Sequence, residues 1–310
     1  MQFMNKSKYF MIFSGLVIVV AVIIGLVLGG LNLGIDFTGG SILTIEMGEE
    51  FEISDVEDAI VQNGVSLDMV QILKAKEVDS DSLTQAVIRM QELPEEMNDA
   101  TVREAIITSL SQTYPAVSGG EVESVGGVTT GEIIANAFLS IVIAAVLMLI
   151  YIWIRFELFS GIAALTALVH DVLIMTAVVT IARVQINSSY IAACLTIVGY
   201  SINDTIVLFD RIRENNKKYS IKDKTRAQVA DISIRETLSR TINTSVTTLV
   251  TILALYIFGV ESIKEFALPL IIGLISGTYS SIFIASPVWV KLMAYKHRKD
   301  YDKLAAKKAK

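Results

Sequence analysis

Six long apolar runs limit what this chain can fold into more than any other feature of its 310 residues. They occupy residues 10–30, 133–154, 158–182, 189–209, 242–260 and 266–292. Each is close to the ~20 residues that a helix needs to cross the hydrocarbon core of a bilayer. Because 53% of the residues are hydrophobic, the sequence predicts a polytopic α-helical membrane protein with six transmembrane helices and excludes a soluble enzyme. The first run exceeds the apolar core of a signal peptide, so it is expected to remain as an uncleaved span.

Charged residues are divided unevenly between residues 31–132 and the rest of the chain. This segment carries 20 Asp and Glu but only four Lys and Arg, whereas the rest carries 12 acidic and 22 basic residues. Twenty of those 22 lie on one side of the predicted spans, in the N-terminus, the turn at 155–157, a loop at 210–240 and the tail from residue 291. The positive-inside rule therefore places both termini in the cytoplasm and the acidic segment outside.

The acidic segment has the pattern of a folded α+β domain. We expect strands at 41–47, 69–76, 83–90 and 120–125, and helices at 53–63 and from Pro94 to about Thr113. This order, βαββαβ, is that of a ferredoxin-like domain. The predicted organisation is residues 1–30 (N-terminus and first span), 31–132 (extracytoplasmic domain), 133–292 (five spans with the cytoplasmic loop 210–240) and 293–310 (a basic cytoplasmic tail).

Asn203 and Asp204 interrupt the fourth apolar run. A carboxylate within the hydrocarbon region is costly and is by default a functional hypothesis. Asp204 lies about 8 Å inside the end of the run at ~1.5 Å per residue. Ser201 and Thr205 share its helix face. A titrating Asp204 is favoured over a structural one that is only satisfied by a hydrogen bond.

Arg240 is the expected partner of Asp204, because it precedes the fifth run on the same side of the membrane. Threonines continue its helix face at positions 244, 247, 248 and 251. We expect this polar stripe, which includes Thr244, to face the interior and to line a wet path. The alternative is a snorkelling arginine followed by threonines that bond their own backbone.

His170 and Asp171 lie near the middle of the third run. Counted from Leu158, Asp171 lies about 20 Å from the cytoplasmic surface at ~1.5 Å per residue. The sequence therefore places Asp171 and Asp204 in different layers, where they could be successive proton stops with His170 as a shuttle. A pair that only packs helices is the alternative.

Gly273 and Gly277 form a GxxxG pattern in the last run, followed by Ser280 and Ser281. Small residues at this spacing let helices approach closely, so a packing role is expected. The segment GGVTTG at 126–131 has the glycine spacing of a phosphate-binding loop, but Glu132 stands where such a loop needs lysine. Nucleotide binding is therefore excluded, and the segment is interpreted as a hinge.

Six motifs together resemble a known family. They are GIDFTGG at 34–40, ESVGG at 123–127, LVHDV at 168–172, GYSINDTIVLFDRIREN at 199–215, LSRTINTSVTT at 238–248 and GTYSSIFIASP at 277–287. In this order they resemble the SecF branch of the SecD/SecF family of bacterial protein-export membrane proteins, in the resistance-nodulation-division superfamily. The chain departs from the family at Gly127, where a proline is usual, and at Thr129 and Thr130.

The resemblance implies a six-span half that pairs with SecD and works with the SecYEG channel in the bacterial inner membrane. It implies use of the proton-motive force to complete the export of preproteins, with Asp204 and Arg240 tied to proton conduction. The coupling ion is H⁺ or Na⁺. Beyond lipid and these protein partners, no cofactor, metal, catalytic residue, nucleotide or nucleic acid is expected.

Ion-driven motion of the spans would have to reach the outer domain through its two connections to the bundle. The candidate relay residues are Asp204, Arg240, Asp171, His170, Asn203 and Thr244. The candidate coupling residues are Gly34, Asp36, Gly39, Gly40, Gly126 and Gly127.

Three other functions are alternatives to this one. A small-molecule efflux component would need a larger outer domain. An intramembrane aspartyl protease using Asp171 and Asp204 would need a GxGD motif, but Ser-Ile-Asn precedes Asp204, and the two carboxylates lie at different predicted depths. A passive assembly subunit would use its polar groups only to specify helix pairing, and proton flux with and without Asp204 would distinguish it.

Overall fold

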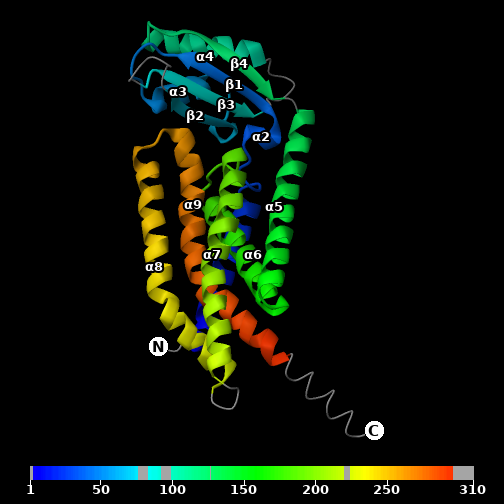
Figure 1. Cartoon of the computed structure of the whole chain (residues 1–310). Helices are drawn as coiled ribbons and strands as arrows, with labels where there is room; N and C mark the ends of the chain where they lie inside the picture. The colour runs from blue at the N-terminus through cyan, green and yellow to red at the C-terminus, as the bar shows by residue number, and fades with distance from the viewer. Residues whose placement is uncertain (1–2, 76–82, 92–98, 126, 220–223, 296–310) are drawn as a thin grey trace.

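The computed structural model describes residues 3–75, 83–91, 99–125, 127–219 and 224–295 of the chain. A bundle of long helices carries a small α/β domain at one end, and the N-terminus lies at the other end (Figure 1). Within the described residues, six helices are long and apolar enough to cross a membrane. The chain is therefore a multi-pass membrane protein that is mostly helical and has one small antiparallel sheet.

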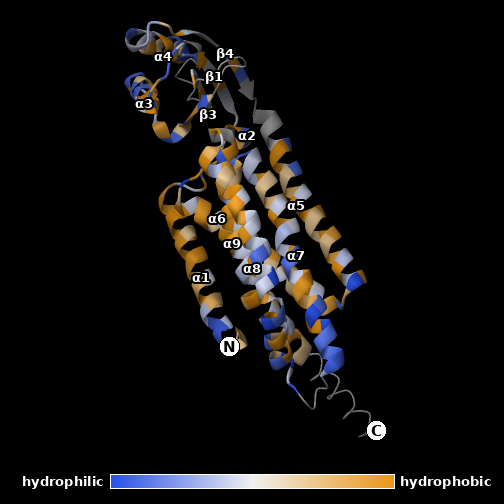
Figure 2. Ribbon diagram, turned by 60° about the vertical axis from the view of Figure 1, so that its left-hand side comes forward, coloured by the Kyte–Doolittle hydropathy of each residue, from blue (hydrophilic) through white to orange (hydrophobic). Residues whose placement is uncertain are grey.

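The six spanning helices are not equally buried. They are α1 (Phe3–Val27), α5 (Gly127–Arg155), α6 (Leu158–Ile181), α7 (Ser188–Lys218), α8 (Arg226–Phe258) and α9 (Glu261–Ser280), the last continuing through a π-helical turn, η2 (Ser281–Ala285), to Tyr295. The α6, α7 and α9 helices form the centre of the bundle, whereas α1 and α5 expose most of their side chains. Figure 2 shows that α1 is largely hydrophobic, as a helix that faces lipid would be.

The α/β domain follows α1. Its elements are α2 (Ile35–Thr38), β1 (Gly40–Glu46), α3 (Ile53–Gln62), η1 (Leu67–Met69), β2 (Val70–Ala75), β3 (Gln85–Gln91), α4 (Asp99–Thr113) and β4 (Ser118–Val125). The sheet has the order β2-β3-β1-β4, and each neighbouring pair is antiparallel. From β1 onward, the strands and longer helices follow the order predicted from the sequence; residues 92–98, which include Pro94, lie outside the described part.

Alternation along the strands builds the core of this domain. In β1 the inward residues Leu43 and Ile45 are fully buried, and Ile88 of β3 faces them from the next strand. Val56 of α3 and Ile106 of α4 are also fully buried and complete the same cluster. The two helices therefore cover one face of the sheet, as Figure 1 shows.

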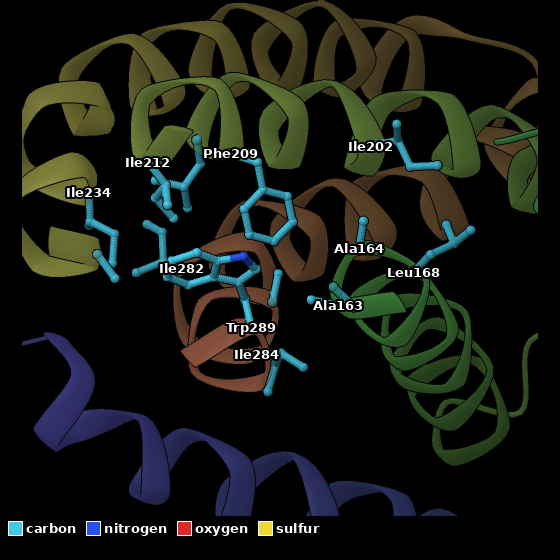
Figure 3. Packing of buried hydrophobic residues seen from close by; sticks show 14 of the residues in the cluster. Ala163, Ala164, Leu168, Ile202, Phe209, Ile212, Ile234, Ile282, Ile284 and Trp289 are labelled. Atoms are coloured by element: carbon cyan, nitrogen blue, oxygen red, sulfur yellow. The ribbon is translucent and has the colours of Figure 1, made fainter. Parts of the chain in front are cut away.

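A second core lies in the half of the bundle that is remote from the α/β domain. It includes Phe209 and Ile212 of α7 and Trp289 beyond η2, each no more than 3% exposed. Figure 3 shows these side chains converging with Ile282 and Ala163 from neighbouring helices. This cluster holds α7 against α9 well past the end of the fourth apolar run.

The predicted loop at 210–240 is wrong, because most of it is helical. The α7 helix runs on to Lys218, and α8 begins at Arg226. Thr225 and Gln228 form a reciprocal capping box at the start of α8. The prediction ended each helix where its apolar run ended, but Arg, Lys and Glu, which are frequent beyond Phe209, favour helix about as well as leucine does. Residues 293–295 of the predicted tail are likewise helical, and the remainder lies outside the described residues.

Contacts between the two extensions hold them together. Asn215 of α7 is 2% exposed, and its Nδ2 donates to Ser233 Oγ of α8 at 3.0 Å. Glu236 of α8 accepts from the same Asn215 and from Arg211 Nε of α7, at 2.6 and 2.7 Å. The bundle therefore continues as a paired helical stalk rather than a mobile connection.

Candidate polar site in the helix bundle

A fully buried carboxylate lies at the centre of the bundle. Asp171, in the middle of α6, is 0% exposed. Its Oδ2 accepts hydrogen bonds from Ser201 Oγ of α7 (2.5 Å) and Ser280 Oγ of α9 (2.8 Å). Its Oδ1 accepts a third from Ser276 Oγ of α9 (2.7 Å). A buried charge is tolerated only when it is paired and hydrogen-bonded, and these hydroxyls meet part of that requirement.

His170 extends this network to α1. Its Nδ1 lies 3.1 Å from Asp171 Oδ1, and its Nε2 lies 2.9 Å from both Ser14 Oγ and Tyr279 Oη. Ser14 Oγ and Tyr279 Oη are 2.7 Å apart and share a hydrogen bond. We call the connected residues the Asp171 network: Ser14, His170, Asp171, Ser201, Ser276, Tyr279 and Ser280. It joins four helices through hydroxyl and imidazole groups, which can donate and accept hydrogen bonds, around a carboxylate that accepts them.

Asp204 lies in a smaller polar cluster at the adjoining face of α7. It is 8% exposed, and Ser245 Oγ of α8 lies 3.4 Å from its Oδ2. Ser245 also donates to the carbonyl of Thr241 and accepts from Thr278 Oγ1 of α9, both at 2.9 Å. A hydroxyl has one proton, so Ser245 can serve either the Asp204 carboxylate or the Thr241 carbonyl at a given moment. Asp204 is therefore held less firmly than Asp171.

The predicted contact between Asp204 and Arg240 is not formed. In the described part of the chain no hydrogen bond or ion pair joins them, and Arg240 is exposed on α8. The buried face of α8 carries Thr241 and Ser245 instead. Two polar stripes lie side by side on this helix, and spacing cannot decide which of them faces inward.

The threonines of the stripe bond to the backbone of their own helix, as the alternative interpretation expects. Thr244 Oγ1 donates to the Arg240 carbonyl at 2.9 Å, and Thr248 Oγ1 donates to the Thr244 carbonyl at 3.0 Å. Thr247 and Thr251 are exposed and make the same kind of backbone bond. Each hydroxyl of the stripe thus bonds to the backbone of its own helix.

The two carboxylates are much closer in depth than the sequence indicated. Ser201, which contacts Asp171, is one turn before Asp204 on α7. The depth estimate was wrong because it counted Asp204 from the end of the apolar run, whereas α7 continues to Lys218. Among the described residues, no side chain bonds to both carboxylates.

Asn203 is also not brought to the site. It is exposed on α7, whereas its neighbour Asp204 is buried. Successive residues on a helix point about 100° apart, so only one of the two can face the α8 interface. Among the predicted relay residues, the fold therefore gathers His170 and Asp171 in one network and leaves Asn203, Arg240 and Thr244 at the margin.

The small residues of α9 set the distance between α7 and α9. A Cβ at Gly273 would lie 2.5 Å from Ile197 Cγ1, and a Cβ at Gly277 would lie 3.2 Å from Ser201 Cβ. Gly277 therefore also brings Ser201 within reach of the Asp171 network. Ser280 belongs to that network, whereas Ser281 bonds to the Thr278 carbonyl of its own helix.

The predicted linker joins the α/β domain to the start of α7. Gly34 N donates to the Ile186 carbonyl at 2.8 Å, and Asp36 Oδ2 accepts from Ser188 N at 2.7 Å. Ser188 is the first residue of α7, where a carboxylate satisfies a free N–H and complements the helix dipole. Asp36 thus fixes the linker on the helix that carries Asp204.

Gly39 and Gly40 start the sheet from this linker. Both have positive φ, 77° and 142°, and a Cβ at Gly40 would lie 2.1 Å from the Met90 carbonyl oxygen. No other residue type fits Gly40 without moving β3. Of the second predicted connection, Gly126 lies outside the described residues, and Gly127 is the first residue of α5.

Sequence reasoning missed a second attachment of the domain. Arg89 of β3 forms a 3.3 Å ion pair with Glu265, in the first turns of α9. Glu265 also accepts from Asn187 Nδ2 at 2.5 Å and from Gln71 of β2. The sequence also did not single out four residues of the polar site: Ser14, Ser276, Tyr279 and Ser245. The signal for Ser276 and Ser280 was their spacing of four, which places two hydroxyls on one helix face.

Comparison with known proteins identifies the class. Residues 95–295 match the family described as protein export membrane protein SecD/SecF, C-terminal, and residues 24–49 match the SecD/SecF GG motif. The fold and these matches define a membrane protein of the protein-export class. The chain belongs to the SecD/SecF family.

Relatives in that family place it nearer SecF. It is 36% identical over 284 residues to protein translocase subunit SecF of Haemophilus influenzae, covering 92% of this chain and 83% of the relative. It is 38% identical to SecF of Desulfurispirillum indicum, covering 92% and 89%. Protein translocase subunit SecDF of Bacillus subtilis is 36% identical, covering 96% of this chain but 39% of that relative.

Solved structures share the fold. The crystal structure of SecDF, a translocon-associated membrane protein from Thermus thermophilus, superposes with a TM-score of 0.75 at 30% identity. That match covers 96% of this chain and 39% of the solved chain. SecDF in a super-membrane-facing form superposes with a TM-score of 0.71, covering 99% and 40%. This chain therefore spans about two fifths of the SecDF chains.

Proposed function

We propose that this chain is a SecF-type subunit of the bacterial Sec protein-export machinery and that it uses the proton-motive force to move its α/β domain. Its relatives are named protein translocase subunits, which supports a transport role rather than an enzymatic one. We infer that the α/β domain is ferredoxin-like, on the strength of its βαββαβ order and its β2-β3-β1-β4 sheet.

One observation carries the proposal: α7 and α9, which contribute Asp204 and the hydroxyl donors of Asp171, also bind the α/β domain and its linker. The α7 helix carries Asp204 and Ser201, and its first residue bonds to Asp36 of the linker. The α9 helix carries Ser276 and Ser280, and its first turns carry Glu265, which pairs with Arg89 of the sheet. A shift between α7 and α9 at the Asp171 network would therefore tilt the domain.

Asp204 is the group that gains and loses the proton. It is buried and has one long hydrogen bond, and we propose that the charge of Arg240 on α8 attracts it. Protonation removes the attraction between the two, whereas ionisation restores it. One charge that crosses 100 mV supplies about 2.3 kcal/mol, which is enough to bias a two-state element. The coupling ion is H⁺ in this proposal, with Na⁺ as the variant to be tested.

A second six-span unit would complete the site. Arg240, Asn203 and Thr247 lie at the level of the spans but are exposed on this chain. Intramembrane polar residues almost always face a bundle interior or a water-filled cavity. We propose that SecD covers this face. The SecDF relatives support this pairing, since their chains are more than twice as long as the part matched here.

The remaining partners follow from the same family. We propose that the assembly works in the bacterial inner membrane with the SecYEG channel, with both termini cytoplasmic and the α/β domain outside. There the domain would handle the emerging preprotein. The word translocon in the description of the Thermus thermophilus structure supports the association with a channel.

The test compares Asp204→Asn with Asp210→Asn in the assembled complex. Asp210 is exposed on the same helix, 58% at its side chain, and serves as the matched control. We expect Asp204→Asn to abolish both proton flux into vesicles and proton-dependent export, and Asp210→Asn to leave both unchanged. Normal export by Asp204→Asn would overturn the proposal.

Two further measurements separate the alternatives. Export that persists while proton flux is lost would indicate a passive assembly subunit. Replacing Na⁺ with K⁺ at constant pH distinguishes the coupling ion, because an H⁺-driven cycle should not respond. Extrusion of small apolar cations by the same vesicles would instead indicate an efflux component.

A further inference from the structure

A cavity lies at the end of the bundle that is remote from the α/β domain. Its volume is about 310 Å³. It lies between the α5–α6 turn, the last turns of α7, the start of α8 and the helix beyond η2. Its floor is aromatic, formed by Phe209 and Trp289, which lie side by side in Figure 3. Neither the Asp171 network nor Asp204 lines this cavity.

Three cations from two helices line the cavity. They are Arg213 and Lys217 of α7 and Arg226 of α8. Glu157, at the N-cap of α6, is the one carboxylate among the described lining residues, so the wall is net positive. Arg213 and Lys217 are exposed, so water solvates their charges, but all three cations would attract an anion in the cavity.

Arg226 is the lining cation with an unsatisfied hydrogen-bond donor. One Nη donates to Asn216 Oδ1 of α7, which fixes the guanidinium plane. Its Nε is buried, and it is the only buried side-chain nitrogen or oxygen in the described residues that has no hydrogen-bond partner. Arg226 is therefore the lining cation whose hydrogen bonds the described residues satisfy least, and an unsatisfied buried donor is costly.

The chemistry that fits is a phosphate group. Its oxygens match the planar fork of arginine, and the two flanking cations neutralise its charge. The cavity lies where the spans end, and its floor is indole and phenyl, the surface that accompanies the interfacial region of a bilayer. A free phosphate ion would use the cations but not the aromatic floor.

We propose that this cavity binds the headgroup phosphate of an anionic phospholipid, with Arg226 as the principal contact. The bound lipid would hold the α5–α6 turn against the stalk formed by α7 and α8. This site is independent of the proposed ion path.

The test measures phospholipid binding to the purified full-length protein by native mass spectrometry. The probes are phosphatidylglycerol and phosphatidylcholine with the same acyl chains. We expect phosphatidylglycerol to bind and phosphatidylcholine to bind more weakly. Arg226→Lys keeps the charge but loses the fork, and it should weaken phosphatidylglycerol binding by about tenfold. Lys217→Gln should weaken it by a smaller factor.

Lys218 provides a matched control. It follows Lys217 on α7 but does not line the cavity, and its Nζ lies 5.5 Å from the Tyr219 ring centroid. Lys218→Gln should bind phosphatidylglycerol as the wild type does. Equal losses in Lys217→Gln and Lys218→Gln would indicate nonspecific charge and overturn the site. If Arg226 variants unfold, Arg213→Gln and Lys217→Gln provide the same comparison.

Competition with inorganic phosphate distinguishes a lipid headgroup from a free phosphate ion as the ligand of the cavity. We expect phosphate at millimolar concentration to leave phosphatidylglycerol bound. Complete displacement of the lipid, with phosphate raising the melting temperature as much as the lipid does, would overturn the lipid assignment. Unchanged lipid binding in a folded Arg226→Lys protein would overturn the role of Arg226.

Discussion

Ser201 of α7 donates a 2.5 Å hydrogen bond to Asp171 of α6, one turn before Asp204. This bond joins α7, the helix that carries Asp204, to the Asp171 carboxylate, which accepts hydrogen bonds from three serines. Ser201 is 3% exposed and also faces Gly277, so its position is set by the close approach of α7 and α9. A change at Asp204 that shifts α7 therefore acts directly on the Asp171 network.

Ser201→Ala should destabilise the protein by about 1–3 kcal/mol, because a fully buried carboxylate loses a donor. Denaturant-induced unfolding in detergent measures this. Thr196→Val is the control, since Thr196 is partly exposed on the same helix and its hydroxyl bonds to the Ala192 carbonyl. Equal losses of unfolding free energy in the two variants would show that the Ser201–Asp171 bond contributes no more to stability than a hydroxyl bond to the backbone.

Gly273→Ala should destabilise the protein by about 1–3 kcal/mol, because the added methyl would overlap Ile197, 2.5 Å from its Cγ1. A β-branched side chain in a helix has one preferred rotamer and cannot move aside easily. Gly199→Ala is the matched control, since a Cβ there meets nothing within 4 Å. That substitution should be neutral or stabilising by up to about 1 kcal/mol through helix propensity. The melting temperatures of the two variants should therefore move in different directions.

Arg89→Gln and Glu265→Gln should each loosen the α/β domain from α9. The pair is partly buried, with side chains 24% and 11% exposed. A double-mutant cycle followed by hydrogen exchange in β2 and β3 should give a coupling of about 1 kcal/mol. The Arg155–Asp210 pair is the control, since both side chains are more than half exposed and its coupling should be close to zero. Additive effects at Arg89 and Glu265 would contradict a direct attachment.

Tyr114 should make the α/β domain less stable at high pH. Its hydroxyl donates to Asp55 Oδ2, and this bond, together with burial, raises the pKa of Tyr114 above its usual value. A raised pKa in the folded state means that the stabilisation is complete below the unfolded pKa of about 10 and is lost as pH rises through the folded pKa. Tyr114→Phe removes the bond at a cost of about 1 kcal/mol at neutral pH.

The measurement is denaturant unfolding of the full-length protein at pH 8 and above pH 10, for wild type and Tyr114→Phe. The difference between the two should shrink as pH rises. If the difference in unfolding free energy between the two proteins stays constant with pH, the bond from Tyr114 to Asp55 is not lost on deprotonation of Tyr114.

Much of the architecture could be predicted from the sequence, because hydropathy and strand alternation are local properties. The six spans and the order of strands and helices from β1 onward follow directly from runs and periods of residue type. The ends of the helices could not be predicted in the same way. Beyond Phe209, α7 is stabilised by contacts such as that of Asn215 with Ser233 of α8, which no local pattern contains.

The candidate site divides in the same manner. His170, Asp171 and Asp204 stood out because a titratable group in an apolar run is rare. Ser14 and Tyr279 did not, because a hydroxyl in a span usually bonds to its own backbone. Only the approach of α1 and α9 to His170 brings them into the Asp171 network.

By itself, the sequence determined that this protein spans a membrane six times, carries an acidic α/β domain and buries two carboxylates, since each is a property of residue type and order. The tertiary structure decided that Asp171 is enclosed by three serines, that Arg240 lies outside contact with Asp204, and that Glu265 holds the sheet. The physical reason is that a helix presents several polar faces, and packing against other helices decides which face is buried.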